Sequence, residues 1–185
     1  MEKNDFDETI SLIANITKEE SVIVAGSQSL HGSYQNLSSK LKETKDLDVL
    51  TKEHREVNFK LGKNSEFAKA KKFHVDANSE LLFEPLLPMG WKERLVDVEI
   101  KGIKTRCLDP NDLASSKLVA ARTKDFEFIK EAIKDNLVDK NIVAERFERI
   151  PKVIDELPQW RYARLKMFNQ INKELIKEKA ENLKD

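Results

Sequence analysis

The sequence predicts a mixed α/β fold of the α+β kind, with a small mixed-sheet core followed by a C-terminal helical bundle. Two observations predict it. Short β-branched or alternating apolar segments occur between helical patterns in the first 108 residues. After Asp109-Pro110 the strand patterns stop and helical patterns continue. We therefore expect an α/β core at residues 1–108 and a helical region at residues 109–185 packed on it.

The composition excludes several classes of protein. The chain has 185 residues, and 33 lysines and arginines balance 33 aspartates and glutamates, so the net charge is zero. A zero net charge argues against nucleic-acid binding driven by overall basic charge. The single cysteine, Cys107, excludes an internal disulfide and disfavours a cysteine-based zinc site. Because no apolar run reaches about 20 residues and no leader pattern is visible, we expect a soluble, cytoplasmic protein without membrane contact.

The first half of the chain alternates helical and strand patterns. Phe6–Glu19 carries apolar residues near the helical period, and Ser21–Ala25 is a short β-branched run that predicts a buried strand. Gly26 and Ser27 end this strand. The other elements expected here are a short helix at Ser27–Leu37, strands at Asp46–Leu50 and Phe73–Ala77, and a hairpin of Leu95–Ile100 with Ile103–Leu108.

The second half is predicted to be helical. Asp109 suits an N-cap, and Pro110 suits the first turn of a helix. We expect two or three helices from there to about Ile150, and a charged helix from about Gln159 to Lys184.

Asp46 and Asp48 are the first candidate site residues. Strand alternation places both side chains on one face, with Leu47 and Val49 on the other. Two carboxylates on one face repel each other unless a cation lies between them, and Mg²⁺ favours one or two carboxylates with phosphate oxygens. Gly26-Ser27, after the preceding strand, supplies backbone N–H groups and a hydroxyl that suit a phosphate. The combination predicts metal-assisted phosphoryl chemistry on a nucleoside triphosphate.

Each feature alone has a plainer interpretation. An Asp-x-Asp pair usually marks a solvated strand face, and a Gly-Ser after a strand is usually a turn. A two-metal site also needs a third acid on a neighbouring strand. The candidates are Asp76, which shares a strand face with His74, and Asp97 or Glu99, whose alternation is also typical of a half-exposed strand.

Several motifs together point to a known family. Val24-Ala25-Gly26-Ser27 and Lys45-Asp46-Leu47-Asp48-Val49 resemble the signature of the DNA polymerase β-type nucleotidyltransferase superfamily, although the 20 residues from Gly26 to Asp46 exceed the common spacing. The segment from Ser21 to Leu137 is similar to a family of small prokaryotic nucleotidyltransferases. Its wider relatives are the abortive-infection toxins of toxin–antitoxin systems. The runs that carry this similarity are Leu61-Gly62, Phe73-His74-Val75-Asp76, Leu87 to Arg94, Leu108 to Leu118, Arg122 and Lys124-Asp125.

The resemblance implies an activity and a set of site residues. It implies a Mg²⁺- or Mn²⁺-dependent enzyme that moves a nucleotidyl group from a nucleoside triphosphate to an acceptor. In the toxin-like relatives the acceptor can be RNA, and an antitoxin-like protein is the implied partner. The resemblance favours Asp76 as the third acid, so that Asp46, Asp48 and Asp76 are metal ligands and catalytic residues. It assigns nucleotide binding to Gly26, Ser27, Lys117 and Asp125.

Other interpretations compete with these assignments. A helical lysine such as Lys117 is usually solvated, and Asp125 suits an N-cap for a helix at Phe126–Ile133. The segment Lys52–Lys72 has a net charge of +4, which suits an RNA acceptor but also an ordinary solvated surface. The alternative to an enzyme is a non-catalytic module that keeps the fold and binds a protein partner. The three acids argue against that alternative, and the long loop before Asp46 argues for it.

Overall fold

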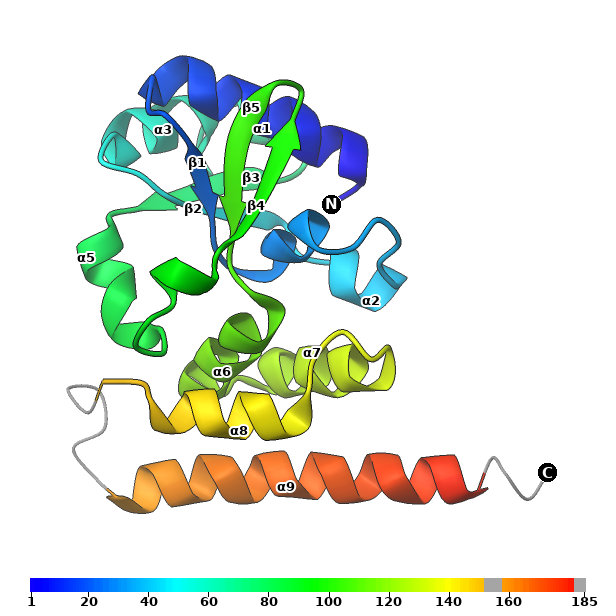
Figure 1. Ribbon diagram of the computed structural model, residues 1–185. Coiled ribbons are helices and arrows are strands. Elements are labelled where there is room, and N and C mark those ends of the chain that lie inside the picture. The colour runs from blue at the N-terminus through cyan, green and yellow to red at the C-terminus, as the bar shows by residue number, and fades with distance from the viewer. Residues whose placement is uncertain (152–157, 182–185) are drawn as a thin grey trace.

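The computed structural model describes residues 1–151 and 158–181 and has the predicted mixed α/β architecture (Figure 1). The strands form one mixed sheet in the order β3-β2-β1-β5-β4. Strand β1 is antiparallel to β2 and parallel to β5, β2 is parallel to β3, and β4 is antiparallel to β5. The strands are β1 (Val22–Val24), β2 (Asp46–Leu50), β3 (His74–Asn78), β4 (Val96–Ile100) and β5 (Ile103–Cys107).

The helices lie close to the predicted positions. Three helices occupy the stretch from Pro110 to Glu148, and the helix expected to reach Lys184 is described as far as Glu181. The helices are α1 (Lys3–Thr17), α2 (Ser39–Lys42), α3 (His54–Leu61), α4 (Glu66–Lys71), α5 (Glu80–Phe83), α6 (Pro110–Ala120), α7 (Thr123–Lys134), α8 (Lys140–Glu148) and α9 (Pro158–Glu181), with 3₁₀ helices η1 (Ser27–Gly32), η2 (Glu84–Leu86) and η3 (Lys92–Arg94). None of the described helices is both long enough and apolar enough to cross a membrane.

One expected helix is shorter than predicted. The segment Ser27–Leu37 forms only the 3₁₀ helix η1, which ends at Gly32. A Cβ atom at Gly32 would come within 2.5 Å of the Cys107 sulfur, so this position requires glycine, whose helix propensity is low.

One face of the sheet is covered by α1 and α3. Strand residues Leu47, Val49 and Val75 are buried on this face. They pack with the helical residues Phe6, Ile10, Ile13, Val57 and Leu61. Because strand side chains alternate, this packing directs Asp46 and Asp48 to the opposite face.

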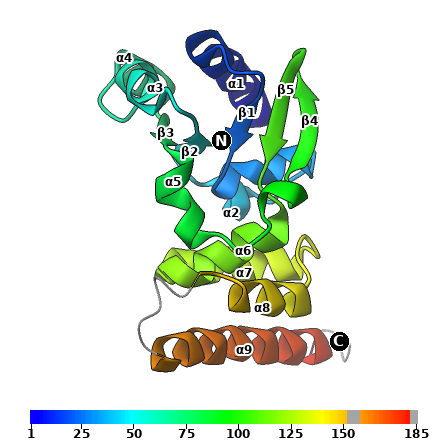
Figure 2. The same cartoon turned by 60° about the vertical axis from the view of Figure 1, so that its left-hand side comes forward.

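A second apolar core joins the sheet to the helical region. It combines Leu30 of η1 and Leu41 of α2 with Leu118 of α6, Ile129 of α7 and Phe168 of α9. Figures 1 and 2 show α9 as the layer farthest from the sheet. The domain division at residue 108 stays a prediction.

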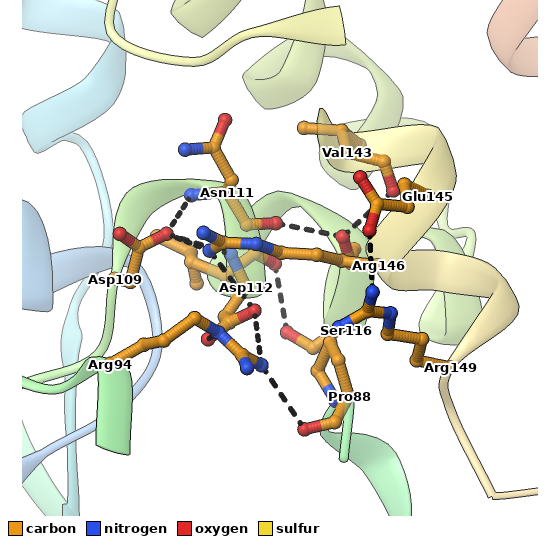
Figure 3. A network of polar contacts seen from close by, with 12 residues as sticks. Pro88, Arg94, Asp109, Asn111, Asp112, Ser116, Val143, Glu145, Arg146 and Arg149 are labelled. Atoms are coloured by element: carbon orange, nitrogen blue, oxygen red, sulfur yellow. Dashed lines mark hydrogen bonds and ion pairs between the residues drawn. The ribbon is translucent and has the colours of Figure 1, made fainter. Parts of the chain in front are cut away.

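A buried ionic cluster fixes the start of α6 (Figure 3). Asp109 is the N-cap, as predicted, and its Oδ1 accepts a hydrogen bond from the Asn111 backbone N–H at 2.8 Å. The side chain of Asp112 is fully buried and accepts from Arg94 Nε at 2.9 Å. Arg146 of α8 pairs with both Asp109 and Asp112. The cluster therefore ties η3, α6 and α8 together through two arginines and two aspartates.

Candidate active site

Asp46 and Asp48 lie on β2, a strand inside the sheet, beside the turn that follows β1. The Ala25 backbone N–H donates to the Asp48 carbonyl oxygen at 2.9 Å, which holds the turn against β2. Gly26 has a φ of +60°, and a Cβ atom there would lie 1.8 Å from Asp48 Oδ2. Only glycine accommodates both this backbone conformation and this close approach. The predicted placement of the two acids beside Gly26 and Ser27 is thus confirmed.

The strand order decides which third acid lies near this pair. Strand β3 is parallel to β2, and its register sets Asp76 opposite Asp48 and His74 opposite Asp46. Strand β4, which carries Asp97 and Glu99, lies at the other edge of the sheet. Both of those acids are exposed, as the half-exposed strand interpretation predicts, and Asp97 pairs with Arg106 at 3.0 Å. The structure therefore brings Asp76 to the pair.

The charges of the three acids affect one another. Burial, and after it the negative charges of Asp46 and Asp76, together raise the pKa of Asp48 to about 6. Lys117 and Arg122 oppose this rise. The charges of Asp46, Asp48 and Asp76 are therefore coupled, and a bound cation would relieve the repulsion among them.

Lys117 and Asp125 lie on the helical side of this site. Asp125, with a fully buried backbone and side chain, accepts hydrogen bonds from Arg122 Nε at 2.7 Å and from Lys117 Nζ at 3.4 Å. Burial would raise the pKa of Asp125, but its hydrogen bonds with Arg122 and the charge of Lys117 outweigh burial and lower it. Asp125 therefore carries a negative charge that holds two cations in place.

Two of the competing interpretations for these residues are wrong. The Lys117 side chain is only 12% exposed, not solvated, and its Nζ lies 4.4 Å from the centre of the Phe128 ring. Burial lowers the pKa of Lys117, while Asp125 and Asp48 raise it. Asp125 is not the N-cap of the next helix, because Arg122 is the N-cap of α7 and Asp125 occupies the third helical position. Its carboxylate accepts from the Arg122 backbone N–H at 3.1 Å.

A cleft of about 990 Å³ brings these residues together. It lies between the start of β2 and β3 on one side and α6 and α7 on the other, with α2 at one end. The predicted site residues that line it are Ser27, Asp46, Asp48, Asp76, Lys117 and Asp125. Further lining residues include Lys40, Lys45, His74, Arg122, Lys124 and Phe128.

The basic segment Lys52–Lys72 lies elsewhere. It forms α3 and α4, and the apolar side of α3 packs on the sheet face opposite the acids. All of these residues are described, and none of them lines the cleft. The positive side chains that do line it come from other parts of the chain, including Lys117, Arg122 and Lys124.

The acids fit a divalent ion only together with other ligands. Among the described histidine, cysteine, aspartate and glutamate side chains, no group of three is arranged to hold a metal ion. Mg²⁺ typically binds one or two carboxylates, water and phosphate oxygens. The half-buried Asp48, beside Asp46, is a suitable carboxylate donor for such a mixed site.

The arrangement of three acids facing two cations across a cleft suits phosphoryl chemistry, and the comparison with known families agrees. Residues 4–179 match the family described as "Nucleotidyltransferase of unknown function (DUF6036)". The chain belongs to this family. The match covers the sheet, the cleft and most of α9, and it supports a transferase activity. No curated protein and no solved structure matches the chain.

Two residues that line the cleft, Arg122 and His74, were not assigned to the site from the sequence. Arg122 was visible as part of the family resemblance and as a basic residue three positions before Asp125, a spacing that permits a side-chain pair at a helix start, but it was given no nucleotide-binding role. His74 was visible as the neighbour of Asp76 on one strand face. Its role becomes apparent only when the parallel register sets it opposite Asp46.

Proposed function

We propose that this protein transfers a nucleotidyl group from a nucleoside triphosphate to an acceptor hydroxyl, with RNA as the acceptor. Asp46 and Asp48 would hold Mg²⁺ or Mn²⁺, and Asp76 would complete the metal site. Bound there, the ion supplies Lewis-acid neutralisation of phosphate charge. The relation to the polymerase β-type superfamily and to toxin–antitoxin systems stays a prediction from the sequence.

The observation that carries the proposal is the charge arrangement across the cleft. Three carboxylates on β2 and β3 face Lys117 and Arg122, and all five residues line the same cleft. Asp125 neutralises only one of the two cations, so the group of Asp125, Lys117 and Arg122 keeps one positive charge. A triphosphate with a divalent ion satisfies both sides, because the ion balances the acids and the phosphates balance the cations.

The residues divide the reaction between them. The Ser27 hydroxyl and the backbone at Gly26 contact the phosphates, and Lys117 and Arg122 hold the β- and γ-phosphates. The acceptor hydroxyl attacks the α-phosphorus and forms a new P–O bond, while the bond to the β-phosphate oxygen breaks. The proton of the hydroxyl passes to the Asp76 carboxylate, and pyrophosphate leaves on the side of Lys117.

The test combines binding with transfer. The full chain is incubated with each α-³²P-labelled nucleoside triphosphate, Mg²⁺ and total RNA, and labelled RNA is resolved on a denaturing gel. We expect label in RNA, release of pyrophosphate, and a rise in melting temperature with Mg²⁺ and triphosphate together.

The control variant is Asp46→Asn. It should keep the fold and lose the melting-temperature shift, because it removes one carboxylate of the metal site. No triphosphate binding by the wild-type protein would favour the non-catalytic module, and an equal shift in the variant would remove Asp46 from the metal site.

A further inference from the structure

The two sides of the cleft carry different chemistry. The helical side is lined by five cationic side chains and three acidic ones, so it is positive on balance, whereas β3 contributes only His74 and Asp76 to the lining. The cationic ones are Lys117, Arg122, Lys124, Lys130 and Lys134, and the acidic ones are Asp125, Glu127 and Glu131. In phosphoryl transfer the attacking and leaving oxygens lie roughly in line on opposite sides of the phosphorus. If pyrophosphate leaves toward the cations, the acceptor approaches from the side of β3. This step rests on the proposed function.

His74 is placed to meet such an acceptor. The parallel register sets it beside Asp46, with the two strands about 4.8 Å apart. Alternation sets it on the same face as Asp76, about 6.6 Å along the strand. The backbone N–H of His74 donates to the Lys45 carbonyl oxygen at 2.9 Å, which fixes its position.

The imidazole of His74 is available for a ligand. The residue is half-buried and lines the cleft, and no side chain or backbone group in the described residues hydrogen-bonds to its ring. The other histidines differ: His31 contacts the Met1 carbonyl oxygen at 3.2 Å, and His54 contacts that of Lys52 at 3.2 Å. His74 is thus a ring that lines the cleft and whose nitrogens, within the described part of the chain, are free to hydrogen-bond a ligand.

The sheet edge offers no alternative way to bind the acceptor near Ala77. Asn58 of α3 donates to the Ala77 carbonyl oxygen at 2.7 Å and accepts from its N–H at 2.9 Å. These bonds occupy the outward backbone groups of β3 at that position, so an added strand cannot pair there. The side chains that this side offers to an acceptor in the cleft are those of His74 and Asp76, with the exposed Lys45 nearby.

The surroundings of His74 select the chemical class of the acceptor. Asp46 lies opposite His74 on β2, and Asp76 lies two residues further along β3. One divalent ion offsets two of the three negative charges of Asp46, Asp48 and Asp76, and the remaining charge disfavours a terminal phosphate. A neutral hydroxyl is not repelled, and two adjacent hydroxyls engage both Asp76 and His74. The positive charge of Lys45, at the edge of the cleft, can then pair with the phosphodiester that links the terminal nucleotide to the rest of the chain.

We propose that His74 is an acceptor-binding residue that hydrogen-bonds the hydroxyl next to the attacking one, so that the site takes an RNA end with a free 2′,3′-diol. His74 contacts one hydroxyl of the terminal ribose, and Asp76 takes the proton from the other. The attacking oxygen bonds to the α-phosphorus as pyrophosphate departs, and His74 takes no part in that proton transfer.

The first test compares variants in the transfer reaction. His74→Ala should lower transfer to RNA at least tenfold, mainly through a higher KM for RNA, while triphosphate affinity stays within twofold of wild type. His74→Gln keeps a donor and an acceptor and should recover transfer to within about threefold. His54→Ala, at the start of α3 and outside the cleft, is the matched control and should behave as wild type. Equal KM values for RNA in wild type and His74→Ala overturn the proposal.

The second test does not depend on turnover. The full chain with labelled histidines is titrated with Mg²⁺, α,β-methylene-ATP and a short RNA that ends in ribose or in 3′-phosphate. The His74 ring signals, assigned through His74→Gln, should shift with the ribose end and not with the phosphate end, while the His54 signals stay constant. No shift, or equal shifts with both RNAs, overturns the proposal. Failure of the proposed function is read separately, from the absence of triphosphate binding or transfer in the wild-type protein.

Discussion

Two buried aspartates each hold two cationic side chains, and they differ in charge balance. Asp112 joins Arg94 and Arg146 with the help of Asp109, so two positive charges meet two negative ones. Asp125 joins Lys117 and Arg122 without a second acid, so one positive charge stays unbalanced. Burial raises the pKa of Asp112 despite its arginines, whereas hydrogen bonds and charge lower that of Asp125 despite burial.

The difference separates a structural cluster from a functional one. The Asp112 cluster is neutral and connects η3, α6 and α8 (Figure 3). The Asp125 cluster faces Asp46 and Asp48 across the cleft, and its excess positive charge interacts with those acids. Both clusters contain a buried aspartate, so burial does not tell the candidate site from the structural cluster. The excess charge of the Asp125 cluster does tell them apart.

The largest expected effect is the loss of the balanced cluster. Asp112→Asn leaves two partly buried arginines with too little negative charge and should lower the free energy of unfolding by about 3–5 kcal/mol. Triphosphate affinity of the folded protein should stay within twofold of wild type. Denaturant unfolding and a nucleotide titration measure both quantities.

Two variants bracket this result. Asp97→Asn removes an exposed pair with Arg106 and should cost less than about 1 kcal/mol. Asp125→Asn should cost about 1–2 kcal/mol, because Asp46 and Asp48 partly replace its charge, but it should weaken triphosphate binding. Equal stability losses for Asp112→Asn and Asp125→Asn would contradict the distinction between the clusters.

The next effect concerns the turn that sets the acidic side of the cleft. Gly26→Ala forces a Cβ atom to within 1.8 Å of Asp48 Oδ2 at a φ of +60°, so either the turn or the carboxylate must move. We expect a stability loss of about 2–3 kcal/mol and at least tenfold weaker triphosphate binding.

Gly102→Ala is the matched control for this substitution. Gly102 also has a positive φ, +77°, but a Cβ atom there meets nothing within 4 Å. It should cost only the backbone strain, about 1 kcal/mol, and leave nucleotide binding unchanged. If both alanine variants behave alike, contact with Asp48 is not what requires glycine at position 26.

The helical side is tested by Lys117→Ala. A charge-assisted contact with the triphosphate is worth about 1.5–3 kcal/mol, so the affinity for Mg²⁺-triphosphate should fall about tenfold or more. Lys177→Ala, on the exposed face of α9, provides the comparison and should bind as wild type. Isothermal titration in moderate salt measures the affinity of both variants for Mg²⁺-triphosphate. Unchanged affinity for Lys117→Ala would remove this lysine from the site.

Local patterns were sufficient for the acidic side of the cleft. Alternation in β2 placed Asp46 and Asp48 on one face, and the Gly-Ser turn marked the end of β1. The helical side of the cleft was harder to predict from the sequence. Lys117 has the sequence pattern of an ordinary surface lysine, and only the fold shows that Phe128 and Asp125 cover it. Only the family resemblance singled it out in the sequence.

Contacts between distant segments could not be predicted from periodicity. The pairing of Arg94, Asp112 and Arg146 joins three elements, and nothing in the local sequence of any one of them selects the others. The segment Lys52–Lys72 lies on the opposite side of the sheet because it forms the connection between the parallel strands β2 and β3. Such crossover connections are right-handed, and this handedness sets the face on which their helices pack.

The smallest expected effect tests the repulsion among the acids. Burial, Asp46 and Asp76 raise the pKa of Asp48 to about 6, so folding binds a proton between the unfolded value near 4 and about 6. The wild-type protein should therefore lose stability as the pH rises through this window. Asp48→Asn carries no charge and should escape this loss.

The rise in the pKa of Asp48 to about 6 corresponds to at most about 3 kcal/mol, and solvent around the half-buried carboxylate reduces the expected gain of Asp48→Asn at pH 7.5 to about 1–2 kcal/mol. At pH 4 the gain should vanish, because the wild-type carboxyl is then protonated. Urea unfolding without divalent ions at both pH values measures the difference. A gain of equal size at pH 4 and pH 7.5 would show that packing, and not charge repulsion, sets the stability at this position.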